Sequence, residues 1–308
     1  MKLLTNIDVL DMTDYLSKYA FSFSSDAIGN LINNIASNID GVTSPKVLKD
    51  CFSFMDLTSL HSNDTSASIA KMVEKVNELQ KLYPEYPLPA SVCVYPNFAS
   101  VVKSTRNSEE LHVTTVASCF PSAQSYLEVK VRECELAVEN GADEVDIVLA
   151  LNAFLSGDGE AASAEIVAMR QAVDKVAHSQ GREVVLKVIL ETGLLVSPEN
   201  IANASFLAME AGADFIKTST GKVPVNATPV AACVMCGCIK KFYETTGKKV
   251  GFKAAGGISS AADAISYYSI VATILGKEWL TKQYFRLGVS RLANNLMSAL
   301  EQKTVSFF

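Results

Sequence analysis

The sequence has few basic residues for its size, and they are scattered along the chain. Its 308 residues include 27 Lys and Arg against 33 Asp and Glu, which gives a formal net charge of −6 at pH 7. No block of Lys and Arg occurs anywhere. Bulk electrostatics therefore argue against nucleic acid or an anionic membrane as a partner, and an anionic substrate would need a local basic pocket.

The chain also lacks the marks of export. Its seven cysteines, an odd number, are spread from Cys51 to Cys238, unlike the dense pairs of a secreted disulfide scaffold. The first residues carry no long apolar segment, and residues 1–48 hold five Asp and no Arg, unlike a transit peptide. The longest uncharged stretch, residues 223–239, contains Asn226 and two prolines, which argues against a membrane span. We therefore expect reduced thiols and a cytoplasmic protein.

Signatures of bound cofactors are weak. The three His residues show no metal-ligand spacing. Cys233, Cys236 and Cys238 lie close together, but a second ligand pair is missing and the segment has the pattern of an apolar helix, so buried thiols are the better interpretation. A run that resembles a phosphate loop fails, because Ile216 replaces its first glycine and Val223 its Ser or Thr. The sequence predicts no metal and no other cofactor.

The chain does contain short β-branched runs that alternate with segments of helical period, such as Ile69–Leu82. From Lys49 to Gly288 there are 240 residues, or 240/8 = 30 for each of eight strand-helix units. Units of this size predict an α/β fold, a (β/α)8 TIM barrel. An open doubly wound sheet is the rival, but no Gly-x-Gly-x-x-Gly follows the first strand. The barrel, with a C-terminal tail, is assigned to residues 49–308, and its strands to Cys51–Leu57, Ser91–Tyr95, Leu111–Ala117, Asp143–Leu149, Glu183–Leu190, Asp214–Thr218, Lys248–Lys253 and Tyr284–Gly288.

Residues 1–48 lie outside this pattern and are predicted to form an N-terminal helical extension. Ser24, Ser25 and Asp26 can cap a helix whose apolar positions recur at helical spacing, and the helix should stop near Gly41 and Pro45. We expect this helix to pack against the barrel floor or to contact a second subunit. Such a contact would join two copies of the chain in a homodimer, and the sequence leaves the oligomeric state open.

Two segments of the chain echo one another, Leu136–Asp146 and Leu207–Lys217, at an offset of 71 residues. Each ends a helix at a glycine and enters a strand two residues later. The echo places Asp146 and Lys217 at the same depth in two strands separated by one other. Because alternate strands of a barrel supply one layer of side chains, an acid and an amine should share a level of its interior.

Charged residues occupy strand positions that should be apolar: Lys187, Lys217, Lys253, Asp146 and Asp56. Buried charges are costly unless they are paired. A structural ion-pair network is one interpretation. The other is an active site, because these residues lie at or near strand ends, where barrels build their sites.

A lysine that is desolvated and crowded by a second ammonium group becomes a neutral nucleophile near pH 7, as a Schiff-base enzyme requires. A carboxylate at the same level can then move protons. Gly256 and Gly257, and the run Gly288–Arg291, follow the last two strands, where barrels commonly bind phosphate. Tight turns alone would also account for these glycines.

These residues resemble the deoxyribose-phosphate aldolase family. The similarity runs collinearly from about Lys49 to beyond Gly288, and Phe215–Lys222 is its most specific run. The other matching runs are Phe54–Leu60, Val92–Pro96, Gly141–Asp146, Val225–Thr228 and Gly251–Gly257.

The resemblance implies a metal-free class I aldolase of deoxyribose and deoxyribonucleotide catabolism. Such an enzyme interconverts 2-deoxy-D-ribose 5-phosphate with D-glyceraldehyde 3-phosphate and acetaldehyde. Lys217 would be the Schiff-base lysine, Lys253 the cation that lowers its pKa, Asp146 the acid/base working with an ordered water, and Asp56 part of the charge network. The substrate and its phosphate would be held by Lys222, Thr220, Gly221, Gly256, Gly257, Gly288, Ser290 and Arg291.

The chain departs from the family pattern at three places. Ala254 replaces the usual proline after the second lysine. Val289–Arg291 replaces Ala-Ser-Ser, so a hydroxyl is lost and a guanidinium is gained, and we expect Arg291 to compensate at the phosphate. The sequence closes with Ser306–Phe308 in place of the tyrosine of several family members, which leaves open whether the tail takes part in proton transfer.

Two alternatives remain open at this level. Another Schiff-base barrel, an aldolase or a transaldolase, would share the amine but not the acceptor. A non-catalytic barrel that binds a sugar phosphate would need no reactive amine, and the presence of both Lys217 and Lys253 argues against it.

Overall fold

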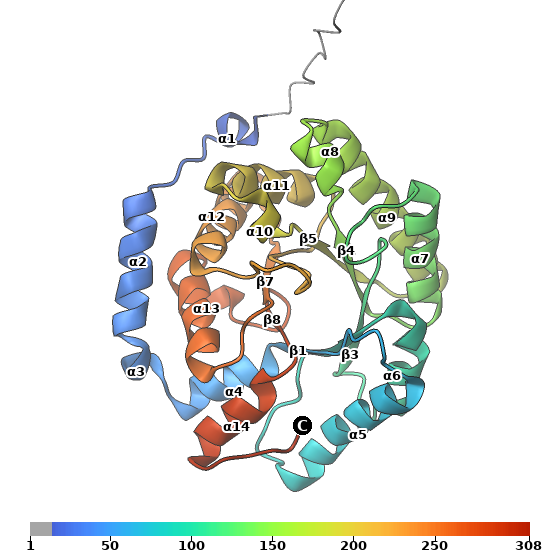
Figure 1. The fold of residues 1–308 in the computed structure, drawn as a ribbon, viewed down its shortest axis with the longest axis vertical. Helices are drawn as coiled ribbons and strands as arrows, with labels where there is room; N and C mark the ends of the chain where they lie inside the picture. Colours follow the sequence, from blue (N-terminus) through green and yellow to red (C-terminus); the bar gives the residue numbers. More distant parts are fainter. Residues whose placement is uncertain (1–13) are drawn as a thin grey trace, which may run out of the picture.

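In the computed structural model, which describes residues 14–308, the predicted barrel is confirmed (Figure 1). Eight parallel strands close on themselves, each hydrogen-bonded to the next along the chain, and the last pairs with the first. The strands are β1 (Met55–Thr58), β2 (Ser91–Val94), β3 (His112–Val116), β4 (Glu144–Val148), β5 (Val185–Ile189), β6 (Phe215–Lys217), β7 (Gly251–Ala255) and β8 (Phe285–Val289).

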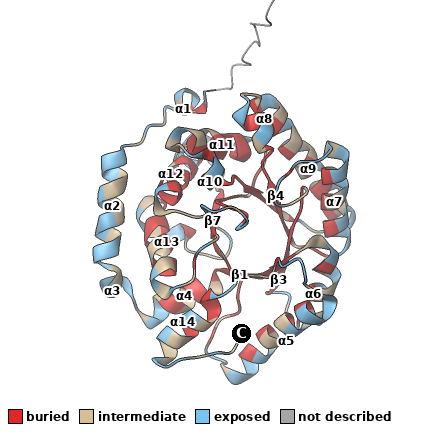
Figure 2. Cartoon of the chain, viewed as in Figure 1, coloured by how far each residue is buried: buried red, intermediate tan, exposed pale blue. Residues whose placement is uncertain are grey.

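Helices surround the strands and cover them from the outside (Figures 1 and 2). The longer ones in this ring are α5 (Ser66–Leu82), α6 (Ala99–Thr105), α7 (Leu127–Glu139), α9 (Gly159–Ser179), α11 (Pro198–Glu210), α12 (Pro229–Thr246), α13 (Ala261–Ile274) and α14 (Leu292–Glu301), and two short helices, α8 (Leu151–Leu155) and α10 (Thr192–Leu195), follow β4 and β5. Both glycines of the sequence echo, Gly141 and Gly212, follow helix ends at positive φ, as predicted.

The predicted start of the first strand is wrong. Helix α4 (Pro45–Ser53) occupies the segment from Cys51 to Ser53, and the strand begins at Met55. Ser44 caps this helix through its side chain, and Pro45 favours its first turn. Leu48, Cys51 and Phe52 are spaced as one helical face and are buried, so their apolar character reflects a helix. The other seven predicted runs overlap the observed strands.

The N-terminal segment packs on the outside of the helical ring. Helix α2 (Ser25–Ser37) starts at the predicted cap, where the Ser24 hydroxyl accepts a hydrogen bond from the Ala27 amide at 3.2 Å. It packs against α12 and α13, and not against the barrel floor (Figure 1). Helix α1 (Tyr15–Lys18) packs on α11, and the short α3 (Ile39–Val42) on α13. The expected boundary after residue 48 falls inside α4, and residues 1–13 lie outside the described part of the chain.

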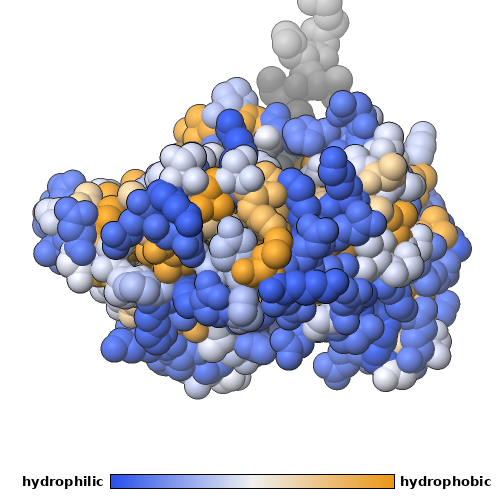
Figure 3. All heavy atoms as spheres, turned by 90° about the horizontal axis from the view of Figure 1, so that it is seen from below, coloured by the Kyte–Doolittle hydropathy of each residue, from blue (hydrophilic) through white to orange (hydrophobic). Residues whose placement is uncertain are grey.

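The helix-facing sides of the strands and the inner faces of the helices form one continuous apolar core (Figure 2). Five cysteines are buried in this core as free thiols, including Cys233, Cys236 and Cys238 on α12, as predicted, and Cys93 is buried in a separate small cluster. The edge of the molecule in Figure 3 is largely hydrophilic, with apolar side chains gathered in patches between the polar ones. Over residues 14–308, no helix combines the length and the apolar character that crossing a membrane requires.

Candidate active site

The carboxyl ends of the strands surround a cavity of about 260 Å³, which we call the upper cavity. The loops after the strands converge at this end of a parallel barrel, which is where such barrels build active sites. Lys217, at the end of β6, lines the cavity. So do the eight residues expected around a phosphate, namely Lys222, Thr220, Gly221, Gly256, Gly257, Gly288, Ser290 and Arg291.

Two of these glycines are required because neighbouring side chains occupy the space that a Cβ atom would need. Gly256 has φ +85°, and a Cβ there would lie 2.7 Å from the side chain of Asn226. A Cβ on Gly288 would lie 2.9 Å from that of Ala255 and 3.1 Å from Cε of Lys253. A larger residue at either position would displace the loop or the lysine, so these glycines shape the wall of the upper cavity.

Asp146 is the centre of the site and lies beneath the upper cavity, fully buried inside the barrel. Its Oδ2 atom accepts hydrogen bonds from Lys217 Nζ at 2.8 Å and from Lys253 Nζ at 2.7 Å. Its Oδ1 atom accepts one from Lys187 Nζ at 2.9 Å. The acid and the amine of the echoed strands therefore meet at one level, as the repeat predicts.

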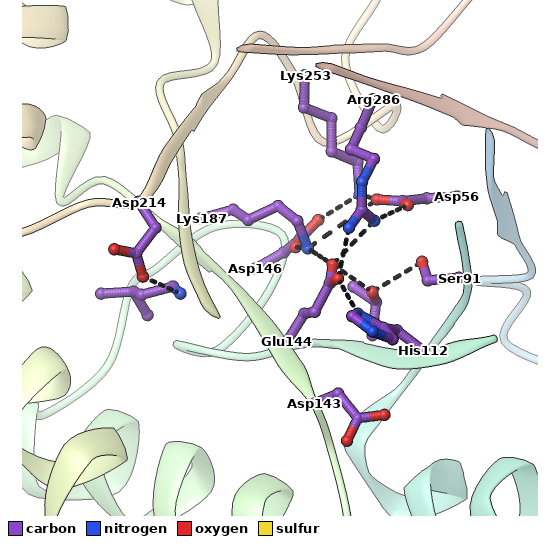
Figure 4. A network of polar contacts seen from close by, with 12 residues as sticks. Asp56, Ser91, His112, Asp143, Glu144, Asp146, Lys187, Asp214, Lys253 and Arg286 are labelled. Atoms are coloured by element: carbon purple, nitrogen blue, oxygen red, sulfur yellow. Dashed lines mark hydrogen bonds and ion pairs between the residues drawn. The ribbon is translucent and has the colours of Figure 1, made fainter. Parts of the chain in front are cut away.

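Below Asp146 the network continues toward the other end of the barrel (Figure 4). Asp56 Oδ2 lies 2.5 Å from Lys253 Nζ, and its Oδ1 accepts a hydrogen bond from Arg286 at 2.6 Å. Glu144 pairs with Arg286 at 2.6 Å and with Lys187. Each of these side chains is almost wholly buried, so the charges compensate one another in place of water.

The three buried lysines differ in their affinity for a proton. Burial lowers the pKa of Lys217, and Lys253 adds to this effect, while Asp146 opposes it. Burial also acts against the charge of Lys253, but Asp146 and Asp56 raise its pKa well above the usual range. For Lys187, the charges of Asp146 and Glu144 outweigh burial and raise the pKa. Lys217 is therefore the amine of the three that most readily becomes neutral.

Asp146 itself remains ionised. Burial acts to raise its pKa, but the three ammonium groups of Lys187, Lys217 and Lys253 hold it well below its ordinary value. The site thus combines an amine that gives up its proton easily with a carboxylate that stays ionised beside it. Once Lys217 is neutral, one of the three charges that lower the pKa of Asp146 is gone, which favours proton uptake by this carboxylate. This is the pairing that carbinolamine and carbanion chemistry need.

Comparison with known proteins places this site in a family. Residues 52–272 match the model of the DeoC/LacD family aldolases. The chain belongs to this family. It is 41% identical over 253 residues to the deoxyribose-phosphate aldolase of Homo sapiens, which covers 79% of this chain and 77% of the human protein, and 39% identical over 261 residues to that of Mus musculus, with the same two shares.

Solved structures of the family agree with the fold. The tetrameric deoxyribose phosphate aldolase of Aeropyrum pernix superposes with a TM-score of 0.63 and 25% identity, over 87% of this chain and 97% of that one. Membership of the family makes the chain an aldolase, a carbon–carbon lyase. The candidates for its catalytic groups lie where Lys217 and Asp146 meet the upper cavity.

The loop after β6 is held by a residue that the sequence did not single out. Glu191 is buried, and its carboxylate accepts the amide of Thr220 at 3.1 Å and the Thr220 hydroxyl at 2.5 Å. Glu191 has a left-handed backbone with φ +55°. Lys222 reaches across the cavity mouth, where its Nζ donates to the Leu60 carbonyl at 2.6 Å. The cationic side of the cavity is therefore anchored from two other loops, the one after β5 and the one after β1.

Three further charged residues of the network were missed or given no role. The sequence patterns assign no role to Glu144 or Arg286, and they mark Lys187 only as a charge in an apolar strand. All three stand within apolar strand runs, which is the same signal that identified Lys217. His61 was dismissed as a metal ligand, but it lines the upper cavity. Within residues 14–308, no cluster of His, Cys, Asp and Glu side chains is arranged to hold a metal ion.

The C-terminal segment lies beside the cavity. The amides of Phe307 and Phe308 donate to Oδ1 of Asn294, on α14, at 2.8 and 2.9 Å. Phe308 lines a neighbouring cavity of about 230 Å³ together with Thr58 and Ser290, which also line the upper cavity. The Phe308 side chain therefore adds apolar surface beside the upper cavity.

Proposed function

We propose that the chain cleaves 2-deoxy-D-ribose 5-phosphate reversibly into D-glyceraldehyde 3-phosphate and acetaldehyde, through a Schiff base on Lys217. One observation carries the proposal: of the three buried lysines, Lys217 is the one whose pKa is lowered and the one that lines the upper cavity. The named relatives support the choice of substrate.

The first step is attack of the neutral Lys217 amine on the C1 aldehyde of the open-chain sugar. Loss of water from the carbinolamine leaves a protonated imine, which withdraws electrons from the neighbouring carbon. Removal of the proton from the C3 hydroxyl then breaks the C2–C3 bond and releases D-glyceraldehyde 3-phosphate. The enamine left on Lys217 takes a proton at C2, and water releases acetaldehyde and restores the amine.

Asp146 is assigned the proton transfers, because it is ionised and contacts the Lys217 amine at 2.8 Å. Lys253 is assigned an electrostatic role, since it stays charged next to the same carboxylate oxygen. Asp56 holds Lys253 in place. The phosphate is assigned to Lys222, Ser290, Arg291 and the glycine turns, which put backbone N–H groups and cationic side chains on one wall of the cavity.

Borohydride trapping tests the proposal. The protein is incubated with deoxyribose 5-phosphate, reduced, digested and mapped by mass spectrometry. We expect an ethyl group on Lys217, because acetaldehyde is the half of the substrate that stays bound to the amine. A label on Lys187 or Lys222, or a larger adduct with no free acetaldehyde, would replace this function by that of another Schiff-base aldolase or a transaldolase. Binding of the sugar without any label would indicate a non-catalytic barrel.

A cytoplasmic location and a homodimer belong to the same proposal. The seven unpaired thiols support a reducing compartment. Light scattering coupled to size-exclusion chromatography would measure the assembly, and fractionation of cells of the source organism would give the location.

A further inference from the structure

A second cavity, of about 390 Å³, opens at the opposite end of the barrel, where the strands begin. We call it the lower cavity. Its charged and titratable lining comes from β3, β4, β8 and the loops before β3 and β8. These residues are Glu110, His112, Glu144, Lys282 and Arg286.

His112, the first residue of β3, connects the lower cavity to the buried network. Its Nδ1 atom lies 2.7 Å from Glu144 Oε1, and 43% of its side chain is exposed while Glu144 is fully buried. Burial acts to raise the pKa of Glu144, but Arg286 and Lys187 hold it well below the ordinary value. Glu144 is therefore an acceptor, so Nδ1 of His112 carries the hydrogen and the second ring nitrogen is left to gain a proton.

A continuous series of contacts leads from His112 to the Lys217 amine, and Figure 4 shows its part from His112 to Asp146. Glu144 pairs with Lys187, Lys187 donates to Asp146 Oδ1 at 2.9 Å, and Asp146 Oδ2 accepts from Lys217 at 2.8 Å. Apart from His112, these groups lie in the low-dielectric interior, where charges are weakly screened from one another. A change of charge at His112 is thus felt at Lys217.

The charge count of the network gives the direction of this effect. With Lys217 neutral, as nucleophilic attack requires, three cations balance three carboxylates; with Lys217 protonated, one positive charge is in excess. The cations are Lys187, Lys253 and Arg286, and the carboxylates are Asp56, Glu144 and Asp146. A proton on His112 adds a further positive charge at one end, which disfavours a proton on Lys217 at the other.

We propose that His112 is a positioning residue that links protonation in the lower cavity to the charge state of Lys217 in the upper cavity. The effect on activity rests on the proposed function, whereas the effect on the charge state of Lys217 can be measured without turnover. A histidine changes charge near neutral pH. A positive charge on His112 keeps more of Lys217 neutral, so the enzyme loses less activity in mild acid than a variant that carries no charge at this position.

Other charged groups face His112 from the elements packed around it. Glu144 from β4 and Arg286 from β8 face it inside the barrel, and Lys282 and Glu110 face it across the lower cavity. On the outer side of β3, Asp143 accepts the Val113 amide and pairs with Arg106 and Arg182. Lys282 is desolvated, and burial lowers its pKa. A pH effect that remains after His112 is replaced would therefore be assigned to Lys282.

The experiment compares two variants of the full-length protein. His112→Asn keeps an N–H donor near the position of Nδ1 but cannot become charged, whereas His112→Phe removes both. For each, kcat/KM is measured from pH 5.5 to 8.5. We expect His112→Asn to equal the natural protein at pH 8 and to be about threefold less active at pH 5.5. His178→Asn, at the exposed end of α9, is the matched control and should follow the natural protein throughout.

A second measurement separates this linkage from the proposed function. The rate at which a small amine-reactive aryl fluoride modifies Lys217 is followed by peptide mass spectrometry against pH, which reports the neutral amine without turnover. The same threefold difference at pH 5.5 is expected. Equal profiles for His112→Asn and the natural protein, or a uniform loss at every pH, would overturn the linkage. Failure of borohydride trapping alongside an unchanged labelling difference would overturn only the Schiff-base function.

Discussion

Two lysines of this barrel hold the same carboxylate and behave in opposite ways. Lys187 and Lys217 donate to the two oxygens of Asp146 at 2.9 and 2.8 Å, yet the pKa of Lys187 is raised and that of Lys217 is lowered. Lys187 also contacts Glu144 and lies 4.0 Å from Asp56. Lys217 shares its carboxylate oxygen with another ammonium group, that of Lys253.

The comparison shows that burial alone does not make a lysine reactive. Both side chains are almost completely removed from water, so desolvation acts on both. The number of carboxylates around each amine decides the outcome, and the position at the cavity decides whether a neutral amine can meet a substrate. Lys187 is enclosed by the network, whereas Lys217 lies at its open end, which is why we propose that Lys217 is the amine that reacts.

The most severe test removes the reactive member of the pair. Lys217→Arg keeps the positive charge beside Asp146 but cannot form an imine. We expect kcat to fall by about 10⁴-fold or more, with no borohydride label. Lys187→Arg is the matched variant and should keep the ethyl label on Lys217. Substantial turnover in Lys217→Arg would place the nucleophile on another lysine. The difference in pKa between Lys187 and Lys217 would then not explain the reaction.

The next test changes the neighbours of Lys217. In Lys253→Met, a positive charge that lowers the pKa of Lys217 is lost, so this pKa rises and less amine is neutral at pH 7. Activity should fall on the order of a hundredfold there, and part of it should return near pH 9–10 as Lys217 loses its proton. The pH–rate profile measures this, with circular dichroism at each pH to confirm folding, because Asp56 is left with one partner fewer.

Asp146→Asn is the contrast to Lys253→Met. The carboxylate of Asp146 acts to raise the pKa of Lys217, so its removal leaves more of the amine neutral at a given pH. The proton acceptor is nevertheless gone. Activity should therefore stay low across the whole range from pH 6 to pH 10. If alkaline pH restored the activity of Asp146→Asn as fully as that of Lys253→Met, Asp146 and Lys253 would share one electrostatic role.

Much of the barrel could be predicted because local signals agreed with the fold. The β-branched runs, the cap at Ser24 and the glycines after two helices each act within a few residues of the chain. The first strand was placed too early because Cys51 and Phe52 are apolar in either structure. Burial against α13 and α14 selects the helix there, and this choice depends on residues more than two hundred positions away.

The meeting of Asp146 with the buried lysines is predictable from the sequence for a similar reason, since a charge within an apolar strand must have a partner. Glu144 and Arg286 carry the same signal at the lower ends of their strands, where no active site was expected. Glu191 carries no such signal. Its role arises from a left-handed backbone and from a contact with Thr220, 29 residues further on, and neither follows from local pattern.

A smaller effect is expected at the phosphate wall of the upper cavity. Arg291 lines this wall where the family pattern has a serine. In Arg291→Ser, the KM for deoxyribose 5-phosphate should rise about tenfold through loss of a charge-assisted contact, while kcat/KM for unphosphorylated deoxyribose should stay nearly constant. Steady-state kinetics with both sugars decides this. Equal changes for the two would mean that Arg291 does not contact the phosphate.

The smallest expected change concerns the loop after β6. It tests whether this loop, in addition to the ion-pair network, sets the difference in pKa between Lys187 and Lys217. Glu191→Gln keeps the length of the side chain but loses the charge that accepts two hydrogen bonds from Thr220. The loop that carries Lys222 should loosen, and the KM for the phosphorylated sugar should rise about threefold with kcat unchanged.

Thr220→Val removes one of the same hydrogen bonds, so the double variant should be no worse than the poorer of the two single variants. Additive effects would show that the two residues act separately. A shift of the acid limb in Glu191→Gln would show that the loop, and not only the carboxylate count, sets the proton affinity of Lys217.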